Sequence, residues 1–414
     1  MLGLFDEELQ NIVVVGASHA GISFIDNIRK NGFGGRITLV DRQKGGPMER
    51  PPLSKQFLLE TGDKLNPIFL LRRAKWYKEN DIILKLGVEA LEINIKTNLL
   101  SLSSGDKLPF DKLVLATGAR PKLLSGCETL ANTYVLRQPD DAIAIRETAR
   151  KVKSAVIIGG GYIGLEVAAS FRQMGLEVSV IEAAPRLLAR VASPPVASSL
   201  LKLHQKHGVS IHTDVSVTEF VSKQQQFSAV KLANGLMIKG DMLVVGIGVS
   251  PDSSLARKAG LGTEAPDGGA IIVDQSMQTS NSSIMAIGDV ALRQGDKMRI
   301  ESVHNAQDHA ARAVAGLMGE VPPADEAPRF WSDQYDANLQ SVGIVPVDAD
   351  DVTHVARIGQ REGGVSYWSF QGKTLLSVEA IKDVENFMLG AKCLDQNLSP
   401  DPDLIGNPEF DPLA

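Results

Sequence analysis

The chain has few cysteines and no long apolar run. Only two cysteines occur among its 414 residues, Cys127 and Cys393, and they lie far apart in the sequence. They form neither a disulfide framework nor a metal-ligand cluster, which fits a reducing compartment. No apolar run approaches the roughly 18 residues of a membrane span. The first ten residues carry acids and no basic segment, unlike a signal peptide. We therefore expect a cytoplasmic protein with no membrane segment and no metal site.

A strong excess of charge of one sign is also missing. The formal net charge is −6, with 43% hydrophobic and 22% charged residues. This composition is typical of a soluble globular protein with a sizeable core, and it argues against a nucleic-acid partner. At roughly 150 residues per domain, the length predicts two or three domains.

The stretch from Ile12 to Asp41 predicts a strand, a small-residue turn, a helix and a second strand that ends in an acid. This is the dinucleotide fingerprint, in which the turn places a pyrophosphate on a helix N-terminus and the acid takes a ribose hydroxyl. The turn reads Gly16-Ala17-Ser18-His19-Ala20-Gly21, with serine where the second glycine is expected. Alone, this pattern fits a nucleotide site and a generic strand–turn–helix unit equally well.

The same pattern recurs downstream in complete form. A strand over 155–158 leads into Gly159-Gly160-Gly161-Tyr162-Ile163-Gly164, a helix over 165–174, and a strand that ends in Glu182. Two tandem copies, each with its acid in register, are a much stronger indication than one. The remaining chain alternates strands and helices as parallel α/β sheets do, and from Phe330 it changes to alternating strands followed by a helix.

Three segments carry less specific expectations. We expect a basic helix over 56–80 and short antiparallel strands over 82–110, with a turn at Ser104-Gly105-Asp106. The proline-rich acidic stretch over 399–414 predicts a tail that is either loose or ordered only by contact.

Seven motifs in a fixed order resemble the two-dinucleotide flavoprotein reductases. Among these, the chain looks like the ferredoxin, putidaredoxin and rubredoxin reductases that feed bacterial oxygenases. The motifs are Gly16–Gly21, PPLSK (Pro51–Lys55), ATGARP (Ala116–Pro121), GGGYIGLE (Gly159–Glu166), AIGDV (Ala286–Val290), RIESVHNAQ (Arg299–Gln307) and FWSDQYD (Phe330–Asp336). The resemblance spans nearly the whole chain, and PPLSK with FWSDQYD is specific to that branch.

The resemblance implies an α/β fold with two Rossmann-like, glutathione-reductase-like domains and a C-terminal α+β domain. It implies an FAD-binding domain split over 1–115 and 246–325, with an NADH-binding domain over 116–245 inserted into it. Residues 326–414 would then cover the flavin.

The first fingerprint is expected to hold FAD, with Asp41 on the adenosine ribose. Asp289 would accept from a ribityl hydroxyl, whereas the alternative for Gly288-Asp289 is a plain strand-end turn. Trp331 is either near the flavin ring or a core aromatic. The FAD-binding residues implied in this way are Gly16, Ser18, His19, Ala20, Gly21, Asp41, Arg42, Arg50, Lys55, Ala116, Thr117, Gly118, Arg120, Gly288, Asp289 and Trp331.

The second fingerprint is expected to hold the nicotinamide nucleotide. A carboxylate at Glu182 accepts from a ribose 2′-hydroxyl and repels a 2′-phosphate, so we expect NADH over NADPH. Arg186 and Arg190 are close enough in sequence to blur that preference. The residues expected to bind the nucleotide are Gly159, Gly161, Tyr162, Ile163, Gly164, Glu182, Arg190 and Gly248.

Lys55 and Glu166 are the expected catalytic pair. By resemblance, Lys55 lies beside the flavin N5 and pairs with Glu166, and its charge would stabilise the anionic reduced flavin. The alternatives are a solvated lysine and an acid that complements the dipole in the first turn of its helix. Glu301 and His304 either line the site or cap the following helix. We favour a lining role for Glu301 and no catalytic role for His304.

The missing cysteines also limit where electrons leave. No cysteine lies in the Asp41–Lys55 segment, and neither cysteine belongs to a C-x-x-C pattern, so no thiol relay is available. We expect an NADH-dependent FAD reductase, a monomer or homodimer, that passes single electrons to a [2Fe–2S] ferredoxin or rubredoxin. The alternatives are a small-molecule acceptor (quinone, monodehydroascorbate or oxygen) and a binding or signalling role like that of apoptosis-inducing factor.

A ferredoxin is commonly acidic, so a local basic docking patch is expected despite the net negative charge. The candidate cations are Arg72, Arg73, Lys75, Lys297 and Arg299. For each of them, an ordinary solvated basic side chain is an equally good interpretation.

Overall fold

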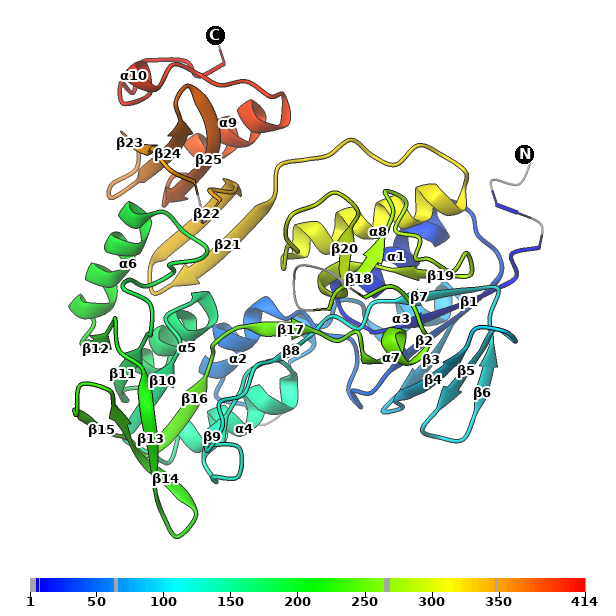
Figure 1. The fold of residues 1–414 in the computed structure, drawn as a ribbon, viewed down its shortest axis with the longest axis horizontal. Helices are drawn as coiled ribbons and strands as arrows, with labels where there is room; N and C mark the ends of the chain where they lie inside the picture. Colours follow the sequence, from blue (N-terminus) through cyan, green and yellow to red (C-terminus); the bar gives the residue numbers. More distant parts are fainter. Residues whose placement is uncertain (1–4, 7, 63–65, 264–268, 347–348, 414) are drawn as a thin grey trace. The chain divides into compact units, whose positions relative to one another are not determined.

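The computed structural model describes residues 5–6, 8–62, 66–263, 269–346 and 349–413. The chain divides into two compact units (Figure 1). Unit 1 comprises residues 1–50, 63–120 and 249–324, and unit 2 comprises residues 51–62, 121–248 and 325–414. The three-domain division expected from the sequence stays a prediction.

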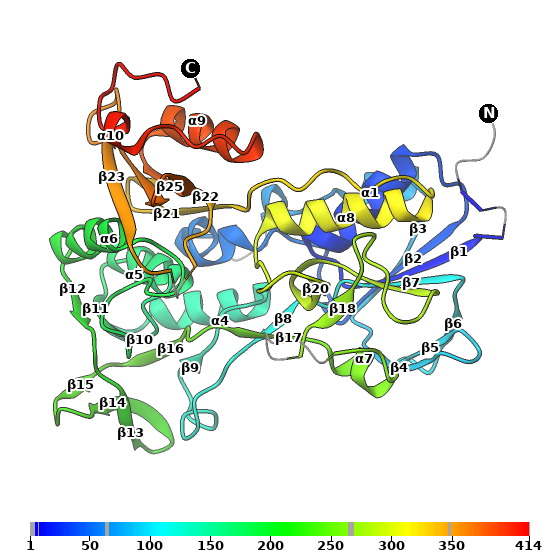
Figure 2. The ribbon, with the colours of Figure 1, turned by 45° about the horizontal axis from the view of Figure 1, so that its top comes forward.

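Unit 1 is built on a five-stranded parallel sheet in the order β19-β7-β1-β2-β3. Its central strand β1 (Asn11–Val15) is almost entirely apolar and buried, as strands covered on both faces are. Its neighbours are β2 (Arg36–Asp41) and β7 (Lys112–Leu115), and the outer strands are β3 (Ile82–Leu86) and β19 (Ile284–Ala286). Helices α1 (His19–Lys30) and α8 (Val303–Leu317) lie side by side (Figures 1 and 2).

Smaller elements complete unit 1. Strands β4 (Ala90–Asn94), β5 (Leu99–Leu102) and β6 (Lys107–Pro109) form an antiparallel sheet, and β18 (Ile271–Val273) pairs with β20 (Ala291–Arg293). The other elements are η2 (Pro67–Phe69), α3 (Ala74–Glu79), β17 (Val249–Pro251), α7 (Ser254–Lys258) and η3 (Gly288–Val290). Strand β8 (Ala119–Pro121), which ends at the unit boundary, pairs with β17.

Unit 2 repeats the parallel sheet in the order β12-β11-β10-β16-β9. Its strands are β9 (Thr133–Tyr134), β10 (Ser154–Ile158), β11 (Glu177–Ile181), β12 (Val209–His212) and β16 (Met242–Val245). Helices α4 (Pro139–Ala149), α5 (Tyr162–Gln173) and α6 (Pro194–Lys206) belong with it. An antiparallel sheet of β13 (Val217–Lys223), β14 (Gln226–Leu232) and β15 (Met237–Lys239) follows. The short η1 (Pro51–Ser54) and α2 (Gln56–Leu59) also lie in unit 2.

The C-terminal part of unit 2 is an antiparallel sheet in the order β21-β22-β25-β24-β23 with α9 packed on it. Its strands are β21 (Arg329–Gln334), β22 (Ala337–Gly343), β23 (Val352–Ile358), β24 (Val365–Gln371) and β25 (Thr374–Ile381). After α9 (Val384–Asp395) comes the short α10 (Pro402–Ile405). The buried Arg357 donates four hydrogen bonds to tail carbonyls between Ile405 and Phe410. The C-terminal stretch is therefore ordered, which is one of the two outcomes expected for it.

Two sequence expectations need correction. The single basic helix over 56–80 is wrong, because the described residues form α2, η2 and α3 with interruptions between them; residues 63–65 lie outside the described chain. Pro67 begins the short η2, and Asn66 caps it by accepting from the Ile68 amide, a start signal that a continuous helix does not contain. Strand β3 is also parallel to β2, so the antiparallel strands start only at β4.

Candidate functional site

The first glycine of each fingerprint is required by the protein's own backbone. Gly16 and Gly159 have φ of +113° and +112°. A Cβ at Gly16 would lie 2.1 Å from the Ala116 carbonyl oxygen, and one at Gly159 would lie 2.3 Å from the Gly246 carbonyl oxygen. Both distances are much shorter than a van der Waals contact. Only glycine therefore allows each turn to approach the loop that follows the neighbouring strand of its sheet.

The last glycine of each fingerprint is equally constrained. A Cβ at Gly21 would lie 2.0 Å from the Gly16 carbonyl oxygen, and one at Gly164 would lie 2.1 Å from the Gly159 carbonyl oxygen. These glycines let the helix start against the turn, so that the first amides of α1 and α5 point toward the turn. Neither helix has an acid in its first turn, which leaves each N-terminus electrostatically suited to a phosphate.

The middle position explains the departure at Ser18. A Cβ at the equivalent Gly161 would meet no protein atom within 4 Å. A serine therefore fits at Ser18 without displacing the protein, and its hydroxyl accepts a hydrogen bond from Arg50 Nε at 3.3 Å. Arg50 also donates to Gln43 Oε1 at 3.1 Å. The substituted position thus fixes one of the arginines expected to contact FAD.

The acids that end the second strands make the same contacts in both copies. Asp41 accepts from the amides of Ala17 at 2.6 Å and Gln43 at 2.7 Å. Glu182 accepts from the amides of Gly160 at 2.6 Å and Ala184 at 2.7 Å. A carboxylate has about four lone-pair sites, so each acid can brace its loop and still accept from a ribose hydroxyl.

A shared acid that the sequence analysis missed organises part of the expected flavin site. Asp252 accepts from Arg42 at 3.0 Å and from Arg120 at 2.8 Å, and its side chain is 6% exposed. Its backbone carbonyl accepts from Thr117 Oγ1 at 2.7 Å, and its amide donates to the Gly118 carbonyl at 2.8 Å. The only sequence signal was its place at the end of the glycine-rich stretch VVGIGVSPD.

The Gly288-Asp289 turn is held from two sides. The Gly288 amide donates to His309 Nδ1 of α8 at 3.1 Å, and the Asp289 carbonyl accepts from Arg299 Nη1 at 2.8 Å. Gly288 has φ of +72°, and a Cβ there would lie 2.8 Å from the Ala20 Cβ. The turn therefore abuts the first fingerprint, although its contact with FAD stays a prediction.

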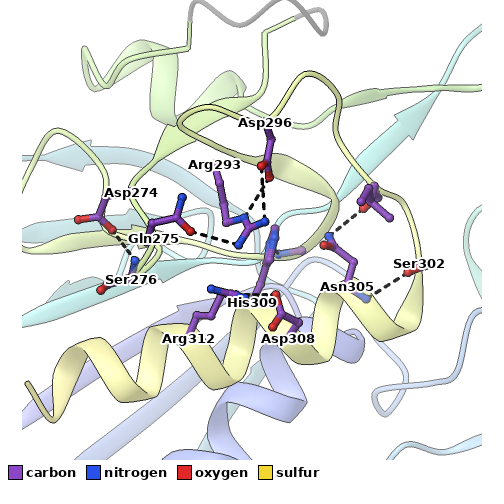
Figure 3. Close-up of polar contacts among 12 residues, drawn as sticks. Asp274, Gln275, Ser276, Arg293, Asp296, Ser302, Asn305, Asp308, His309 and Arg312 are labelled. Atoms are coloured by element: carbon purple, nitrogen blue, oxygen red, sulfur yellow. Dashed lines mark hydrogen bonds and ion pairs between the residues drawn. The ribbon is translucent and has the colours of Figure 1, made fainter. Parts of the chain in front are cut away.

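His309 is buried, and burial lowers the pKa of its imidazole to about 3, with further lowering by the charges of Arg293 and Arg312. Those arginines pair with Asp296 at 3.0 Å and Asp308 at 2.7 Å (Figure 3). The imidazole is therefore neutral at physiological pH, with Nδ1 free of a proton and able to accept. No sequence pattern pointed to His309.

The residues around α8 bear on two expectations. Ser302 is the N-cap of α8, since its hydroxyl accepts from the Asn305 amide at 3.1 Å. The lining and capping alternatives for Glu301 and His304 stay predictions. Glu301 is 41% exposed and pairs with Arg299 at 2.7 Å. Arg299 itself is buried, so its assignment to a solvent-facing docking patch is wrong.

The Lys55–Glu166 ion pair expected from the resemblance is present in unit 2. Lys55 Nζ lies 2.9 Å from Glu166 Oε1, and the two side chains are 14% and 5% exposed. Glu166 also accepts from the hydroxyls of Ser54 and Ser332. The helix of Glu166 begins at Tyr162, and its first turn contains no acid. The dipole-complementing alternative for Glu166 and the solvated alternative for Lys55 are therefore both wrong.

The strand β21 presents alternate residues to α5 and α6. Phe330 stacks on Tyr162 at 4.4 Å, Ser332 bonds to Glu166, and Gln334 bonds to His204. Because strand side chains alternate between faces, Trp331 points to the other face of β21 and is half-buried. Whether Trp331 contacts the flavin stays a prediction.

The expected nicotinamide site is consistent with NADH. Arg190 is exposed and lies beside Gly248, whose Cβ position is 3.5 Å from Arg190 Nη2. Arg186 instead donates to the carbonyls of its own loop between Leu187 and Ala192. It is therefore engaged in holding that loop, which weakens the expectation that it blurs the preference set by Glu182. Tyr162 donates to the Val191 carbonyl at 3.3 Å, and Ile163 is 42% exposed.

The remaining docking candidates differ in how far they are engaged. Arg72 pairs with Asp26 at 2.9 Å and lies over the Trp76 ring, and Lys75 pairs with Glu79 at 3.3 Å. Arg73 and Lys297 are exposed. Among the described helices, none combines the length and the apolar character that crossing a bilayer needs.

Comparison with known proteins adds two family matches. Residues 10–310 match the model of the pyridine nucleotide-disulphide oxidoreductases, and residues 329–412 match the reductase C-terminal model. The putidaredoxin reductase of Pseudomonas putida is 36% identical over 407 residues, covering 96% of this chain and 94% of that protein. The ferredoxin–NAD(+) reductase component of a Pseudomonas putida p-cumate 2,3-dioxygenase system is 34% identical, covering 97% of each.

Solved structures agree with these matches. The ferredoxin reductase for the CYP199A2 system of Rhodopseudomonas palustris superposes with a TM-score of 0.92 at 36% identity, covering 98% of this chain and 99% of that one. Putidaredoxin reductase in its covalent complex with putidaredoxin gives a TM-score of 0.90 at 34% identity, covering 98% and 97%.

Proposed function

Because this chain belongs to the pyridine nucleotide-disulphide oxidoreductase family, FAD and NADH are its cofactors, and we propose that it passes electrons from NADH to a [2Fe–2S] ferredoxin that serves an oxygenase. The observation that carries the proposal is the pair of matched nucleotide cradles in one chain. Each has the same glycine geometry and the same acid bonded to two loop amides. Two cradles of this kind fit two dinucleotides.

The chain has no thiol suited to the disulphide chemistry in the family's name. Cys127 and Cys393 are both buried and free. Burial raises the pKa of the Cys127 thiol, and it raises that of Cys393 to about 11. Both thiols are therefore protonated and unreactive near neutral pH. Electrons must leave to a bound acceptor, and the relatives named above act with ferredoxins or putidaredoxin.

When bound, FAD would supply the exchange between the two electrons that NADH gives together and the single electrons that a one-electron acceptor takes. The chain's own residues supply binding and charge. The loops at Gly16–Gly21 and Gly159–Gly164 hold the two pyrophosphates, Asp41 and Glu182 accept from ribose hydroxyls, and Glu182 disfavours a 2′-phosphate. Lys55, held by Glu166, supplies a cation where reduction brings negative charge. We place the enzyme in the cytoplasm, where NADH and ferredoxins are available.

Anaerobic titration with NADH, followed by stopped-flow mixing with candidate ferredoxins, tests this function. The purified protein should show a flavin spectrum, and about one equivalent of NADH should bleach it. Electron transfer to a [2Fe–2S] ferredoxin should then outpace transfer to quinone, monodehydroascorbate or oxygen in parallel mixes. A protein without flavin refutes the proposal entirely. Fast bleaching with preference for a small molecule supports the first alternative, and very slow bleaching with a long-lived charge-transfer band supports the signalling alternative.

A further inference from the structure

A continuous chain of buried hydrogen bonds leads away from the Lys55–Glu166 pair. Ser332 donates to Glu166 Oε1 at 2.5 Å, Gln334 Nε2 donates to Ser332 Oγ at 3.1 Å, and Gln334 Oε1 lies 2.8 Å from His204 Nε2. Ser332, Gln334 and His204 are each at most 1% exposed. Buried polar groups are costly unless they are paired, and these side chains occupy positions that apolar side chains could otherwise fill.

The carboxylate fixes the direction of every hydrogen bond in this chain. An ionised Glu166 only accepts, so the single Ser332 proton points at it, and Ser332 must accept from the amide nitrogen of Gln334. The amide oxygen of Gln334 then faces His204, which must carry its proton on Nε2. His204 Nδ1 has no partner among the described residues, as expected for an acceptor in an apolar setting. Burial lowers the pKa of His204, in agreement with a neutral ring.

This direction excludes a proton relay. Passing a proton from His204 to Glu166 would require Gln334 to go through its imidic acid tautomer. A hydroxyl can accept and donate a proton at the same oxygen, whereas an amide accepts at its oxygen and donates from its nitrogen. The chain instead orients the carboxylate. Glu166 Oε1 receives both Lys55 and Ser332, while Oε2 receives Ser54, so both oxygens are held in place.

The far end of the chain is anchored on α6. His207 stacks on Tyr335 with ring centres 3.7 Å apart and planes inclined by 9°, and His204 meets the same ring edge-on at 5.2 Å. These contacts fix the end of β21 against α6, and therefore fix the register at which Ser332 reaches Glu166. The sequence motif FWSDQYD supplies Phe330, Ser332, Gln334 and Tyr335, so β21 and the residue that follows it carry the contacts described here.

We propose that Ser332 and Gln334 are positioning residues that hold Glu166 in the orientation that pairs with Lys55. Through this pair they set how stable the reduced flavin is and how fast NADH reduces the oxidised flavin. This inference rests on the proposed function, because it needs Lys55 to act on FAD. Neither residue touches a reacting atom in this scheme, since both act through Glu166. Loss of either should therefore change flavin chemistry more than NADH affinity.

The test compares Ser332→Ala with Ser377→Ala. Ser377 is also buried on a strand of the same sheet, and its hydroxyl has no partner among the described residues, so its removal controls for loss of a buried hydroxyl. Ser332→Ala should lower the NADH-driven reduction rate about tenfold with little change in NADH Kd. It should also lower the equilibrium constant for flavin reduction about tenfold, which is about 30 mV for a two-electron couple. Ser377→Ala should match the wild type in both.

Two further variants keep the inference testable if Ser332→Ala folds poorly. Gln334→Met leaves the Ser332–Glu166 bond but removes its support, and it should shift the flavin potential in the same direction by less. In a Glu166→Ala background, Ser332→Ala should cause no further shift of the flavin potential. The Glu166→Ala substitution has already removed the carboxylate through which Ser332 acts, and the double-mutant cycle measures this coupling.

The outcomes separate this inference from the proposed function. A wild-type protein that NADH does not reduce refutes the function itself. A normally reduced wild type with unchanged potentials in Ser332→Ala and Gln334→Met overturns only the positioning role. A full Ser332→Ala effect in the Glu166→Ala background overturns it as well, since Ser332 would then act by another route.

Discussion

Acidification should destabilise the folded protein through His309, because the ring cannot readily take up a proton beside the Gly288-Asp289 turn whereas the unfolded chain can. At neutral pH the unprotonated Nδ1 accepts from the Gly288 amide. A proton on Nδ1 would place a donor against that donor, in a buried site already flanked by Arg293 and Arg312. The hydrogen bond would be lost, and a third positive charge would face the two guanidinium groups, although Asp296 and Asp308 partly balance these.

The magnitude follows from the pKa shift. The folded pKa of His309 is about 3, against 6.5 for an ordinary imidazole, so the unfolded state binds the proton first as the pH falls. The stability contributed by the neutral ring is fully present above pH 6.5 and is lost progressively between pH 6.5 and 3. At about 1.4 kcal/mol per pKa unit, lowering the pH from 7 to 5 should cost about 2 kcal/mol.

The assay is urea-induced FAD release at pH 7 and pH 5, with His309→Gln as the reference. A glutamine oxygen can accept from the Gly288 amide but does not titrate in this range. Every carboxylate is common to both proteins, so their contributions cancel in the difference. The wild type should lose about 2 kcal/mol more than His309→Gln between the two pH values. Equal losses in the two proteins would refute the role assigned to His309.

Three further predictions follow from the site. Gly16→Ala should destabilise the protein by about 3 kcal/mol and prevent FAD binding, since its Cβ would overlap the Ala116 carbonyl. Gly161→Ala should fold normally yet weaken NADH binding, as thermal melts and NADH titration would show. A stable Gly16→Ala protein that still binds FAD would contradict the requirement for glycine at this position. Arg299→Met should weaken FAD binding at least tenfold, because it removes a buried hydrogen bond to the Asp289 carbonyl and the ion pair with Glu301. Lys297→Met should instead change only ferredoxin kinetics, and fluorescence titration of apoprotein with FAD distinguishes the two variants. Ferredoxin reduction should slow as the salt concentration rises from roughly 0.05 to 0.5 M, because screening weakens electrostatic steering. Stopped-flow rates that do not change with salt concentration would count against a charged docking surface.

The local part of the site could be predicted from sequence because it depends on spacing. The fingerprints at Gly16–Gly21 and Gly159–Gly164 are short, and the first and last glycine of each is required by an atom of the same motif or of the adjoining loop. The acids Asp41 and Glu182 fall at fixed distances from them. Strand β11 ends at Ile181, directly before the acid that the sequence pattern marks as its end.

The rest depends on contacts between segments far apart in sequence. Asp252 pairs with Arg42 across 210 residues. No spacing pattern in the sequence marks a single acid as the partner of such a distant arginine. Arg299 resembled a surface cation because burial is not encoded in its neighbours. The chain from Ser332 to His204 joins two helices to a strand more than 120 residues away. Such residues are recognised only once the packing is known.

The acids that brace the two glycine loops have a consequence for turnover. A loop that had to become ordered around each arriving nucleotide would lose roughly 1–2 kcal/mol of conformational freedom per residue. Here Asp41 and Glu182 already tie both sides of their loops through backbone amides. Each loop is a rigid receptor before any nucleotide arrives. Spent NAD⁺ can therefore leave and fresh NADH can enter at every cycle without the loop melting and re-forming in between.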